Sequence, residues 1–487
     1  MILKILITAL ACITLSNSEE VNIWGPGLSP EKITMPARYF FLEVLNSKDS
    51  VTQEKLSVKI SGDSSSGTCR IWMNILNRKD GSFIIRYRLY EACSNFKIIV
   101  KYKDVHVGSS PYSYAGIIYN EDCDCPEKDF DTWAENYGCP DNIDQLNRDL
   151  RPFKDVNMTN VLQDVLKNYH HPGSMSLCHY LIKNNELHRK CYGQHVGFHI
   201  FSDAILLSVM RKVLLPDQSF FINLGDWPLV KKTSKLIPLF SWCGSTETMD
   251  IVLPTYDLTE STLENMGRVM LDMLSVQGNI ETQWDEKVPQ GFWRGRDSCK
   301  ERLKLVDISR EHPTLYNVSL TNFFFFRDKE ETYGPKVPHI SFFKFFDFKY
   351  QINVDGTVAA YRFPYLLVGN SLVLKQESPY YEHFYHQLQP GVHYVPFKRD
   401  LSDLTEKLQW AMENDDEAQA ISKNGRNFAT KNLMPKDIIC YYAVAFKEWA
   451  KRVADPGEVY EGMEKVHQKE RAEQRCTCSR TSPKDEL

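Results

Sequence analysis

Three stretches in the second half of the chain combine acidic or basic side chains with glycine in patterns that suit chemistry on an anionic substrate. The first is an apolar segment, Phe220–Leu224, that runs into Gly-Asp-Trp-Pro at 225–228. Ligands of open α/β sheets bind beyond the carboxyl ends of the strands, so Asp226 is placed to act as a general base toward a hydroxyl group. An aspartate here could equally cap the following turn, and the residues alone leave the two interpretations even.

The second stretch is Trp-Arg-Gly-Arg at 293–296, which precedes a helix-like segment at 299–310. We expect Asp297 or Ser298 to cap this helix, with Arg302 one turn inside it. Helix N-termini attract anions, and the planar guanidinium group of arginine matches a phosphate with two hydrogen bonds. A solvated basic turn is the plainer alternative, but the flanking aromatic residues favour a pocket.

The third stretch, Asp355–Pro364, contains Thr357 as a candidate N-cap and small residues over the next turn, while Gly369 suits a helix end. We therefore expect a helix that starts at Thr357 and meets an anion with Arg362 nearby. The arginines of the second and third stretches suit a diphosphate whose charge is neutralised without a metal ion.

Two further patterns could hold a metal ion, and we expect neither to do so. Asp-x-Asp pairs at 122/124 and 129/131 have the residue types that bind Mn²⁺ or Mg²⁺. Both pairs lie in a cysteine-rich segment instead of after an apolar strand. His195 and His199 have the spacing of a zinc-binding helix, but Gly197 lies between them and the glutamate of a zinc-protease motif is absent.

The segments that must position these residues alternate between helical stretches and short apolar strands, such as Ile251–Pro254, over residues 151–450. This alternation predicts mostly parallel sheets with helices on their faces, and the length suffices for two such domains with a cleft between them. The aromatic run Phe323–Phe326 is expected in the core or in an interface strand. Residues 451–487 are charged and predict a frayed helix followed by a flexible tail.

Residues 21–118 have a different pattern, in which alternating segments such as Phe40–Val44 are separated by turn residues. Alternation at this spacing predicts an antiparallel β sandwich. The phrases at 25–28 and 106–111 resemble a filamin-type immunoglobulin repeat, which implies a binding or spacer module. A cysteine-dense linker at 119–150 follows.

Both ends of the sequence carry targeting patterns. Residues 1–20 combine an early lysine, a short apolar run and small polar residues, which is the pattern of a secretory signal peptide. No other apolar run is long enough to cross a bilayer, so we expect no membrane span. The sequence ends in the retrieval signal that the KDEL receptor reads in the endoplasmic reticulum lumen, formed by Lys484, Asp485, Glu486 and Leu487.

Composition narrows the function further. The net charge of −5 lacks the basic surplus of nucleic-acid binders, so we expect no nucleic-acid partner. Thirteen cysteines in an oxidising compartment predict disulfides. A thiol oxidoreductase is disfavoured because the sequence contains no Cys-x-x-Cys. Sequons at Asn157 and Asn317 predict N-glycosylation on surface loops.

Across about residues 175–445, several motifs together resemble the Rumi-type protein O-glucosyltransferases, which share a domain with fungal capsule-forming transferases. The filamin-type module and the KDEL ending are similar to the KDEL-motif-containing branch of that family. The motifs are Gly-Asp-Trp-Pro at 225–228, Trp-Arg-Gly-Arg at 293–296 with Arg302, Ala-Ala-Tyr-Arg-Phe at 359–363, and Gly-Val-His-Tyr-Val-Pro at 391–396.

The resemblance implies a GT-B fold of two Rossmann-like domains and inverting, metal-independent transfer from a UDP-sugar to serines of folded epidermal-growth-factor-like repeats. It places the base on Asp226. The Rumi branch usually has a serine where Arg296 stands, and the role of Glu382 is left open. The implied UDP-sugar contacts are Arg294, Gly295, Arg296, Arg302, Ala359, Ala360, Arg362 and Glu382.

The expected function is therefore a protein O-glucosyltransferase that uses UDP-glucose. A UDP-xylose-dependent transferase and a non-catalytic binding protein or chaperone of the endoplasmic reticulum are the open alternatives. We expect disulfides Cys69–Cys93 and Cys178–Cys191. The family resemblance further implies that Cys440 pairs with Cys123, Cys125 or Cys139.

Overall fold

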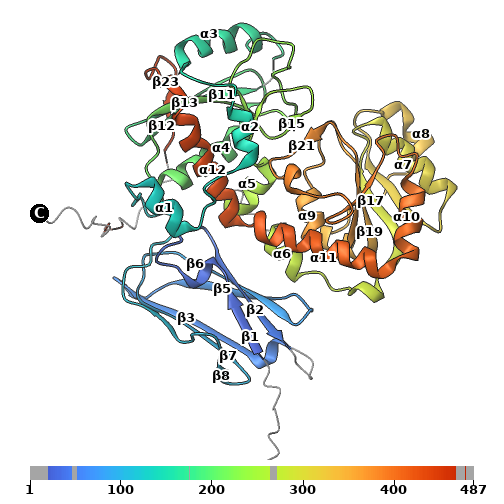
Figure 1. The fold of residues 1–487 in the computed structure, drawn as a ribbon, viewed down its shortest axis with the longest axis horizontal. Helices are drawn as coiled ribbons and strands as arrows, with labels where there is room; N and C mark the ends of the chain where they lie inside the picture. Colours follow the sequence, from blue (N-terminus) through green and yellow to red (C-terminus); the bar gives the residue numbers. More distant parts are fainter. Residues whose placement is uncertain are drawn as a thin grey trace, which may run out of the picture.

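The structure, a computed structural model, describes residues 20–45, 52–174, 176–263 and 271–467, together with Cys476 and Cys478 (Figure 1). Residues 1–19 of the expected signal peptide and the whole KDEL signal lie outside the described residues. Among the helices of the described segments, none combines the length and the apolar character needed to cross a bilayer.

The N-terminal part is an antiparallel β sandwich, as predicted, drawn in blue in Figure 1. One sheet has the order β1-β2-β6-β5 and consists of β1 (Glu20–Trp24), β2 (Arg38–Leu45), β5 (Ile71–Asn77) and β6 (Ser82–Leu89). The other consists of β3 (Leu56–Ser64), β4 (Gly67–Thr68), β7 (Ser94–Tyr102), β8 (Val105–His106) and β9 (Tyr112–Tyr114). The alternating apolar residues meet between the sheets, where the fully buried side chains include Phe40, Phe83, Ile85, Phe96 and Ile98.

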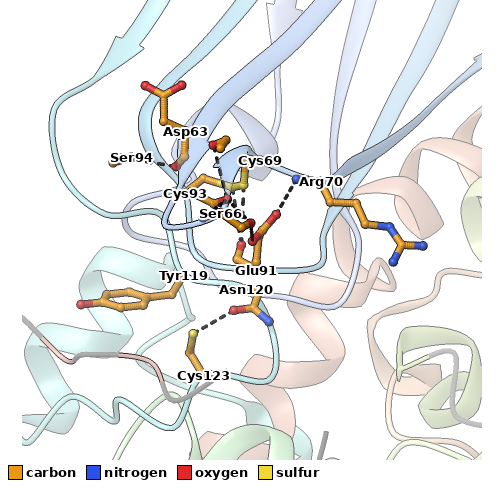
Figure 2. Close-up of a disulfide and its surroundings, with 12 residues drawn as sticks. Asp63, Ser66, Cys69, Arg70, Glu91, Cys93, Ser94, Tyr119, Asn120 and Cys123 are labelled. Atoms are coloured by element: carbon orange, nitrogen blue, oxygen red, sulfur yellow. Dashed lines mark hydrogen bonds between the residues drawn. A yellow bond between two sulfur atoms is a disulfide. The ribbon is translucent and has the colours of Figure 1, made fainter. Parts of the chain in front are cut away.

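The β module passes into the linker beside its own disulfide. Figure 2 shows Cys69–Cys93 close to Tyr119, Asn120 and Cys123, and the main chains of Cys93 and Ile118 exchange two hydrogen bonds. The linker then forms α1 (Phe130–Tyr137) and α2 (Asp144–Leu150).

The linker cysteines are bridged to the C-terminal part of the chain. Cys139 pairs with Cys440, one of the three partners that the resemblance implied. The pairs Cys69–Cys93 and Cys178–Cys191 are present as expected. Two further bridges, Cys123–Cys476 and Cys125–Cys478, were not foreseen.

The first α/β unit is built on a sheet with the order β16-β14-β13-β11-β12-β24. Its strands are β11 (Leu177–Lys183), β12 (Glu186–Tyr192), β13 (Gln218–Asn223), β14 (Phe240–Ser241), β16 (Ile251–Val252) and β24 (Glu464–Lys465). Its helices are α3 (Met158–Tyr169), α4 (His199–Met210), α5 (Tyr256–Leu263) and α12 (Pro435–Ala450).

This sheet is mixed, so the expectation of a mostly parallel sheet is wrong here. β13, β14 and β16 run parallel, but β11 pairs antiparallel with both β12 and β13. The cause is a hairpin between β11 and β12 whose two turn residues, Asn184 and Asn185, have φ of 51° and 59°. Asparagine tolerates this left-handed conformation, which two-residue hairpin turns require.

The second α/β unit has a fully parallel sheet with the order β18-β17-β19-β20-β22. Its strands are β17 (Val288–Arg296), β18 (Tyr316–Asn322), β19 (Phe348–Asn353), β20 (Leu372–Gln376) and β22 (Val395–Phe397). The helices are α6 (Met273–Gly278), α7 (Lys300–Glu311), α8 (Glu330–Tyr333), α9 (Phe363–Leu367), α10 (Leu404–Glu413) and α11 (Asp415–Asn432).

The chain crosses between the two units more than once. α12 follows α11 but returns to the first unit, where the Phe446 ring lies 4.3 Å from that of Phe220. In addition, β15 (Gly244–Ser245) of the first unit pairs with β21 (Tyr380–Tyr381) of the second. These crossings hold the two sheets on either side of one cavity.

The helix expected after residue 450 is not present in the described residues 451–467. This segment instead forms β23 (Val453–Asp455), which pairs with β10 (Val156–Asn157), and β24, which pairs with β12. Asn157 therefore lies in a strand instead of a surface loop. Its side chain caps α3 by accepting from the Asn160 amide at 3.0 Å, and donates to Asp455 at 3.1 Å.

Candidate active site

A cavity of about 580 Å³ lies between the two α/β units. The first unit contributes Asp226, Tyr256 and Asp257 to its wall. The structure brings most of the predicted site residues together here, and only Glu382 is absent from the lining. The second unit contributes Arg294, Gly295, Arg296, Arg302, Ala359, Ala360 and Arg362.

Asp226 follows the carboxyl end of β13, where the sequence placed it. The Asn223 side chain shapes the connecting turn, because its Oδ1 accepts from the Gly225 amide at 2.9 Å and its Nδ2 donates to the Trp227 carbonyl at 2.6 Å. The Asp226 carbonyl oxygen accepts from Cys243 Sγ at 3.2 Å and from Tyr361 Oη at 3.3 Å. The main chain is thus held from both units, and the carboxylate lines the cavity.

Burial raises the pKa of the Asp226 carboxyl group above its ordinary value. The positive charge of Arg296 and a hydrogen bond from Tyr256 act in the opposite direction without cancelling the effect. A carboxylate with a raised pKa takes up a proton more readily, which is what a general base must do as a hydroxyl group attacks.

Positive charge is concentrated on the opposite wall. The pKa of Arg362 is lowered to about 9, first by burial and then by its neighbours Arg302 and Arg296. Burial likewise lowers the pKa of Arg302, to about 10. Within the described residues none of these three arginines forms an ion pair with a carboxylate. Guanidinium groups without a close ion-pair partner in a partly buried cavity favour an anionic ligand, although Asp257 acts on Arg362 and Asp355 on Arg302.

The arginines differ in the donors that they leave for such a ligand. Arg362 donates from Nη1 to the Arg294 carbonyl at 2.5 Å, which orients its remaining donors. Arg302 is committed to its own chain, with donations to the carbonyls of Asp355, Arg296 and Val354 and to Ser298 Oγ. Arg302 therefore fixes the loops of the cavity as much as it adds charge.

Arg294 is anchored to Asn317 instead of presenting these donors to an anion. It donates to the Asn317 carbonyl at 2.8 Å and to the Asn317 side chain at 2.5 Å. Asn317 itself lies in β18, so the expected surface loop at this sequon is wrong as well. Gly295 allows close approach, because a Cβ atom there would lie 2.6 Å from the Trp293 ring and 3.3 Å from Arg362 Nη2.

Two predicted helix starts are displaced. The helix expected from Thr357 begins only at Phe363, and residues 357–362 form an irregular loop along the cavity. Cys299 occupies the N-cap position of α7 in place of Asp297 or Ser298. The Asp297 carboxylate instead accepts from the amides of Phe324 and Phe326.

The aromatic run Phe323–Phe326, whose main chain donates to the Asp297 carboxylate, is only partly buried. Phe323 is 6% exposed, but Phe324 and Phe325 are 54% and 45% exposed. The expectation of a core or interface strand is therefore wrong for the middle of the run. Its main chain turns back on the Asp297 carboxylate after β18 ends, which leaves the two rings at the surface.

Glu382 is fully buried beside the cavity. It accepts from Tyr385 Oη at 3.2 Å, its Oε2 has no partner, and burial raises its pKa to about 8. Asp257, whose pKa burial raises to about 7, lines the cavity but escaped the sequence analysis, as did Tyr256. Both follow the carboxyl end of β16, so the rule that identified Asp226 could have found them.

The discounted metal patterns have ordinary structural partners. Asp129 caps α1 by accepting from the amides of Asp131 and Thr132. His199 lies 3.0 Å from Asp203 in an ion-pair network with Arg189. Three or more metal-ligating side chains do not come together anywhere in the described part of the chain.

A carboxylate that faces an arginine-lined wall across a cleft between two α/β units is an arrangement suited to transfer from a donor with an anionic leaving group. Comparison with known families agrees. Residues 134–485 match Glycosyl transferase family 90, and residues 16–113 match the Filamin/ABP280 repeat. The chain belongs to glycosyl transferase family 90 and carries an N-terminal filamin repeat.

Three curated relatives illustrate the similarity. The chain is 49% identical to Protein O-glucosyltransferase 2 of Danio rerio over 97% of its own length and 95% of the relative. It is 45% identical to Protein O-glucosyltransferase 3 of Homo sapiens, over 99% and 97%. Protein O-glucosyltransferase 1 of Homo sapiens is 29% identical over 65% of this chain and 81% of the relative.

Proposed function

We propose that this protein is an O-glucosyltransferase that moves glucose from UDP-glucose to a serine hydroxyl of a folded epidermal-growth-factor-like repeat, with inversion. The observation that carries the proposal is the opposition of Asp226 to Arg296, Arg302 and Arg362 across one cavity. Full-length similarity to proteins named protein O-glucosyltransferase supports the choice of sugar and of a protein acceptor. We assign the two α/β units to the two Rossmann-like halves of a GT-B fold, with the parallel sheet as the nucleotide half.

In the proposed reaction the serine oxygen attacks the anomeric carbon of the donor while Asp226 accepts the serine proton. The bond between that carbon and the diphosphate oxygen breaks, and its electron pair leaves with UDP. Arg362 and Arg296 stabilise the charge that develops on the diphosphate, in the way that positive groups stabilise other leaving phosphates. The reaction as written needs no metal ion.

The setting that we propose is the lumen of the endoplasmic reticulum, reached through the signal peptide and kept by binding of the C-terminal signal to the KDEL receptor. The described bridges, among them Cys139–Cys440, fit an oxidising compartment. Acceptor repeats form their own disulfides in the same compartment. The sequons at Asn157 and Asn317 stay predictions of N-glycosylation.

The test is a transfer assay with three acceptors: an oxidised epidermal-growth-factor-like repeat, its reduced form and a linear peptide of the same sequence. We expect a hexose mass increment on the oxidised repeat alone, because a rigid acceptor holds its serine close to the anomeric carbon at little entropic cost. UDP-xylose and EDTA form parallel arms, and we expect glucose transfer to dominate and to survive EDTA. Equal labelling of the linear peptide would contradict the folded acceptor, and a strict Mn²⁺ requirement would contradict the arginine site.

A further inference from the structure

A second cavity, of about 570 Å³, lies between the β module and the second α/β unit. We call it the interdomain cavity. One wall is the sheet that contains β1, β2 and β6, and the opposite wall is α11 with the 3-10 helix η4 (Trp284–Glu286). It shares no lining residue with the active-site cavity. Its size is comparable, so it can hold a ligand of similar bulk.

Positive charge exceeds negative charge around this cavity. The carboxylates of its wall are Glu43, Asp80 and Asp437, and the cations are Arg78, Lys423, Arg426, Lys431 and Lys436. Asp437 is occupied by capping α12 through the Met434 amide, and burial raises its pKa to about 6. The wall therefore carries more cations than carboxylates, and Asp437 is also engaged with Lys436 at 3.9 Å.

One carboxylate is shared by two buried guanidinium groups. Asp80 Oδ2 lies 3.0 Å from Arg426 Nη1 and 3.8 Å from Arg78 Nε. The side chains of Arg426 and Arg78 are only 13% and 11% exposed. Burial lowers the pKa of both arginines, and the charge of Arg78 lowers that of Arg426 further. Asp80 is the carboxylate that both guanidinium groups share and Glu43 also acts on Arg78, but the repulsion between the two arginines persists, so a further anion between them would be stabilised.

Residues that line the same space carry buried polar atoms without a hydrogen-bond partner. Nε of Arg78, Nε of Arg426 and Nε2 of Gln283 are buried donors without a hydrogen-bond partner. A buried donor left unpaired costs about 1–3 kcal/mol, and more when the group is charged. Asn370 Oδ1 is an unpaired acceptor in the same wall and suits a hydroxyl group on the ligand.

We propose that the interdomain cavity binds an oxyanion, a phosphate or a carboxylate group, between Arg78 and Arg426 with the Gln283 amide as a further donor. Trp24 stacks on Phe41 at 5.5 Å and is 42% exposed, which gives the rest of the ligand an aromatic face. Because its walls come from both modules, a bound anion would fasten the filamin repeat to the second α/β unit.

The test is calorimetric titration of the full-length protein with inorganic phosphate and, separately, with citrate as a polycarboxylate, at constant ionic strength and with saturating UDP present. We expect saturable binding that Arg426→Gln and Arg78→Gln each weaken at least tenfold. Arg151→Gln, at an exposed arginine, should leave it unchanged, and Arg362→Ala should retain it because the active-site cavity is separate. Tighter binding of phosphate indicates a phosphorylated ligand, and tighter binding of citrate indicates an acidic one.

Absence of saturation with both anions, or equal binding by Arg426→Gln, overturns the proposal. Asp80→Asn provides an independent arm if the arginine variants do not fold. It removes the carboxylate that competes for both guanidinium groups, so the anion should bind more tightly than to the unaltered protein. Unchanged or weaker binding by Asp80→Asn also overturns the proposal.

Discussion

Hydrogen bonds fix the main chain of Asp226, whereas its side chain is the group that accepts a proton. The two functions can therefore be tested separately. Cys243 and Tyr361 hold the carbonyl oxygen, whereas the carboxylate faces Tyr256 and Arg296. Replacing the carboxylate by an amide should therefore leave the loop in place and remove only the proton acceptor.

We predict that Asp226→Asn lowers kcat for transfer to a folded acceptor repeat by about 10²–10⁴, the usual contribution of a general base. The dissociation constant for UDP, measured by calorimetry, should change little. Asp141→Asn, at an exposed aspartate of the linker, is the matched control and should retain full activity. Turnover of Asp226→Asn within a few-fold of the unaltered enzyme would remove Asp226 from the mechanism.

The pH dependence of transfer should report the environment of this carboxylate. Burial raises the pKa of Asp226, so activity should fall with decreasing pH earlier than it would for an exposed aspartate. The hydrogen bond from Tyr256 lowers that pKa, so Tyr256→Phe should move the acid limb of the kcat/KM profile to higher pH. A profile that stays in place or moves to lower pH would show that Tyr256 does not contact the base.

Arg362 and Arg302, two arginines of the active-site cavity, should respond differently to replacement by alanine. Arg362→Ala removes a guanidinium with donors free for the ligand, and should weaken UDP binding by about 1.5–3 kcal/mol. Arg302→Ala removes donations to three main-chain carbonyls, so it should also lower the unfolding temperature of the protein. Calorimetry with UDP and thermal denaturation measure the two effects. Equal unfolding temperatures for the two variants would contradict this distinction.

At the scale of elements, the linker is locked onto α4 by a buried charge cluster. Glu121 accepts from Lys212 at 2.7 Å and from Arg211 at 2.9 Å, and also from Ser208 at 2.6 Å. Burial acts to raise the pKa of Glu121, but the two cations outweigh it and the net pKa is lowered. The linker is thus held in a fixed position against the first α/β unit.

Breaking this charge cluster should lower the free energy of unfolding of the protein. Glu121→Gln leaves Lys212, which is 2% exposed, without a carboxylate, and such losses cost about 3–5 kcal/mol. Urea denaturation at pH 7 measures the loss, and Glu135→Gln on the exposed face of α1 serves as control. Because the folded-state pKa of Glu121 is lowered, its stabilisation is present above the unfolded-state pKa and disappears as pH falls through the folded-state value. A loss below about 1 kcal/mol would contradict a tightly coupled cluster.

The sequence predicted the elements whose signal is local and missed those set by distant contacts. The strand that ends before Asp226 and the helix that contains Arg302 follow from apolar runs and their boundaries. The loop at 357–362 has the composition of a helix start, but Tyr361 donates to Asp226 of the first unit and Arg362 donates to Arg294 of β17. The pairing of Arg294 with Asn317 was hidden for the same reason, since Asn317 belongs to the neighbouring strand.

At the scale of the whole molecule, three disulfides close the transferase body into a ring, in which Cys123–Cys476 and Cys125–Cys478 interleave and Cys139–Cys440 lies inside both. Cys123–Cys476 and Cys125–Cys478 each span 353 residues, and Cys139–Cys440 spans 301. The resemblance pointed only to a bridge between Cys440 and one of Cys123, Cys125 and Cys139, because pairing of the tail cysteines depends on where β23 and β24 lead the chain. The two outer bridges lie two residues apart on each side, so each closes almost the same loop as the other.

We therefore predict that the outer bridges are redundant in stability. Removal of Cys123–Cys476 by a double serine substitution leaves the ring closed through Cys125–Cys478, and should cost about 2 kcal/mol or less by chain entropy. Removal of both should cost more than the sum of the two single losses. Chemical denaturation under non-reducing conditions measures these losses, with the separate Cys69–Cys93 bridge as control. Strictly additive losses would mean that each bridge acts through local packing alone.

The outer bridges also decide the route that a mechanical force takes through the protein. If the N-terminal module is pulled away from the segment after Cys478, tension passes from the linker directly across Cys123–Cys476 and Cys125–Cys478. The covalent path therefore bypasses the residues between those cysteines, and the catalytic cavity among them, once the contacts between the filamin repeat and the second α/β unit have separated. Unfolding of the filamin repeat under such a force would therefore leave the covalent path through the catalytic unit unloaded.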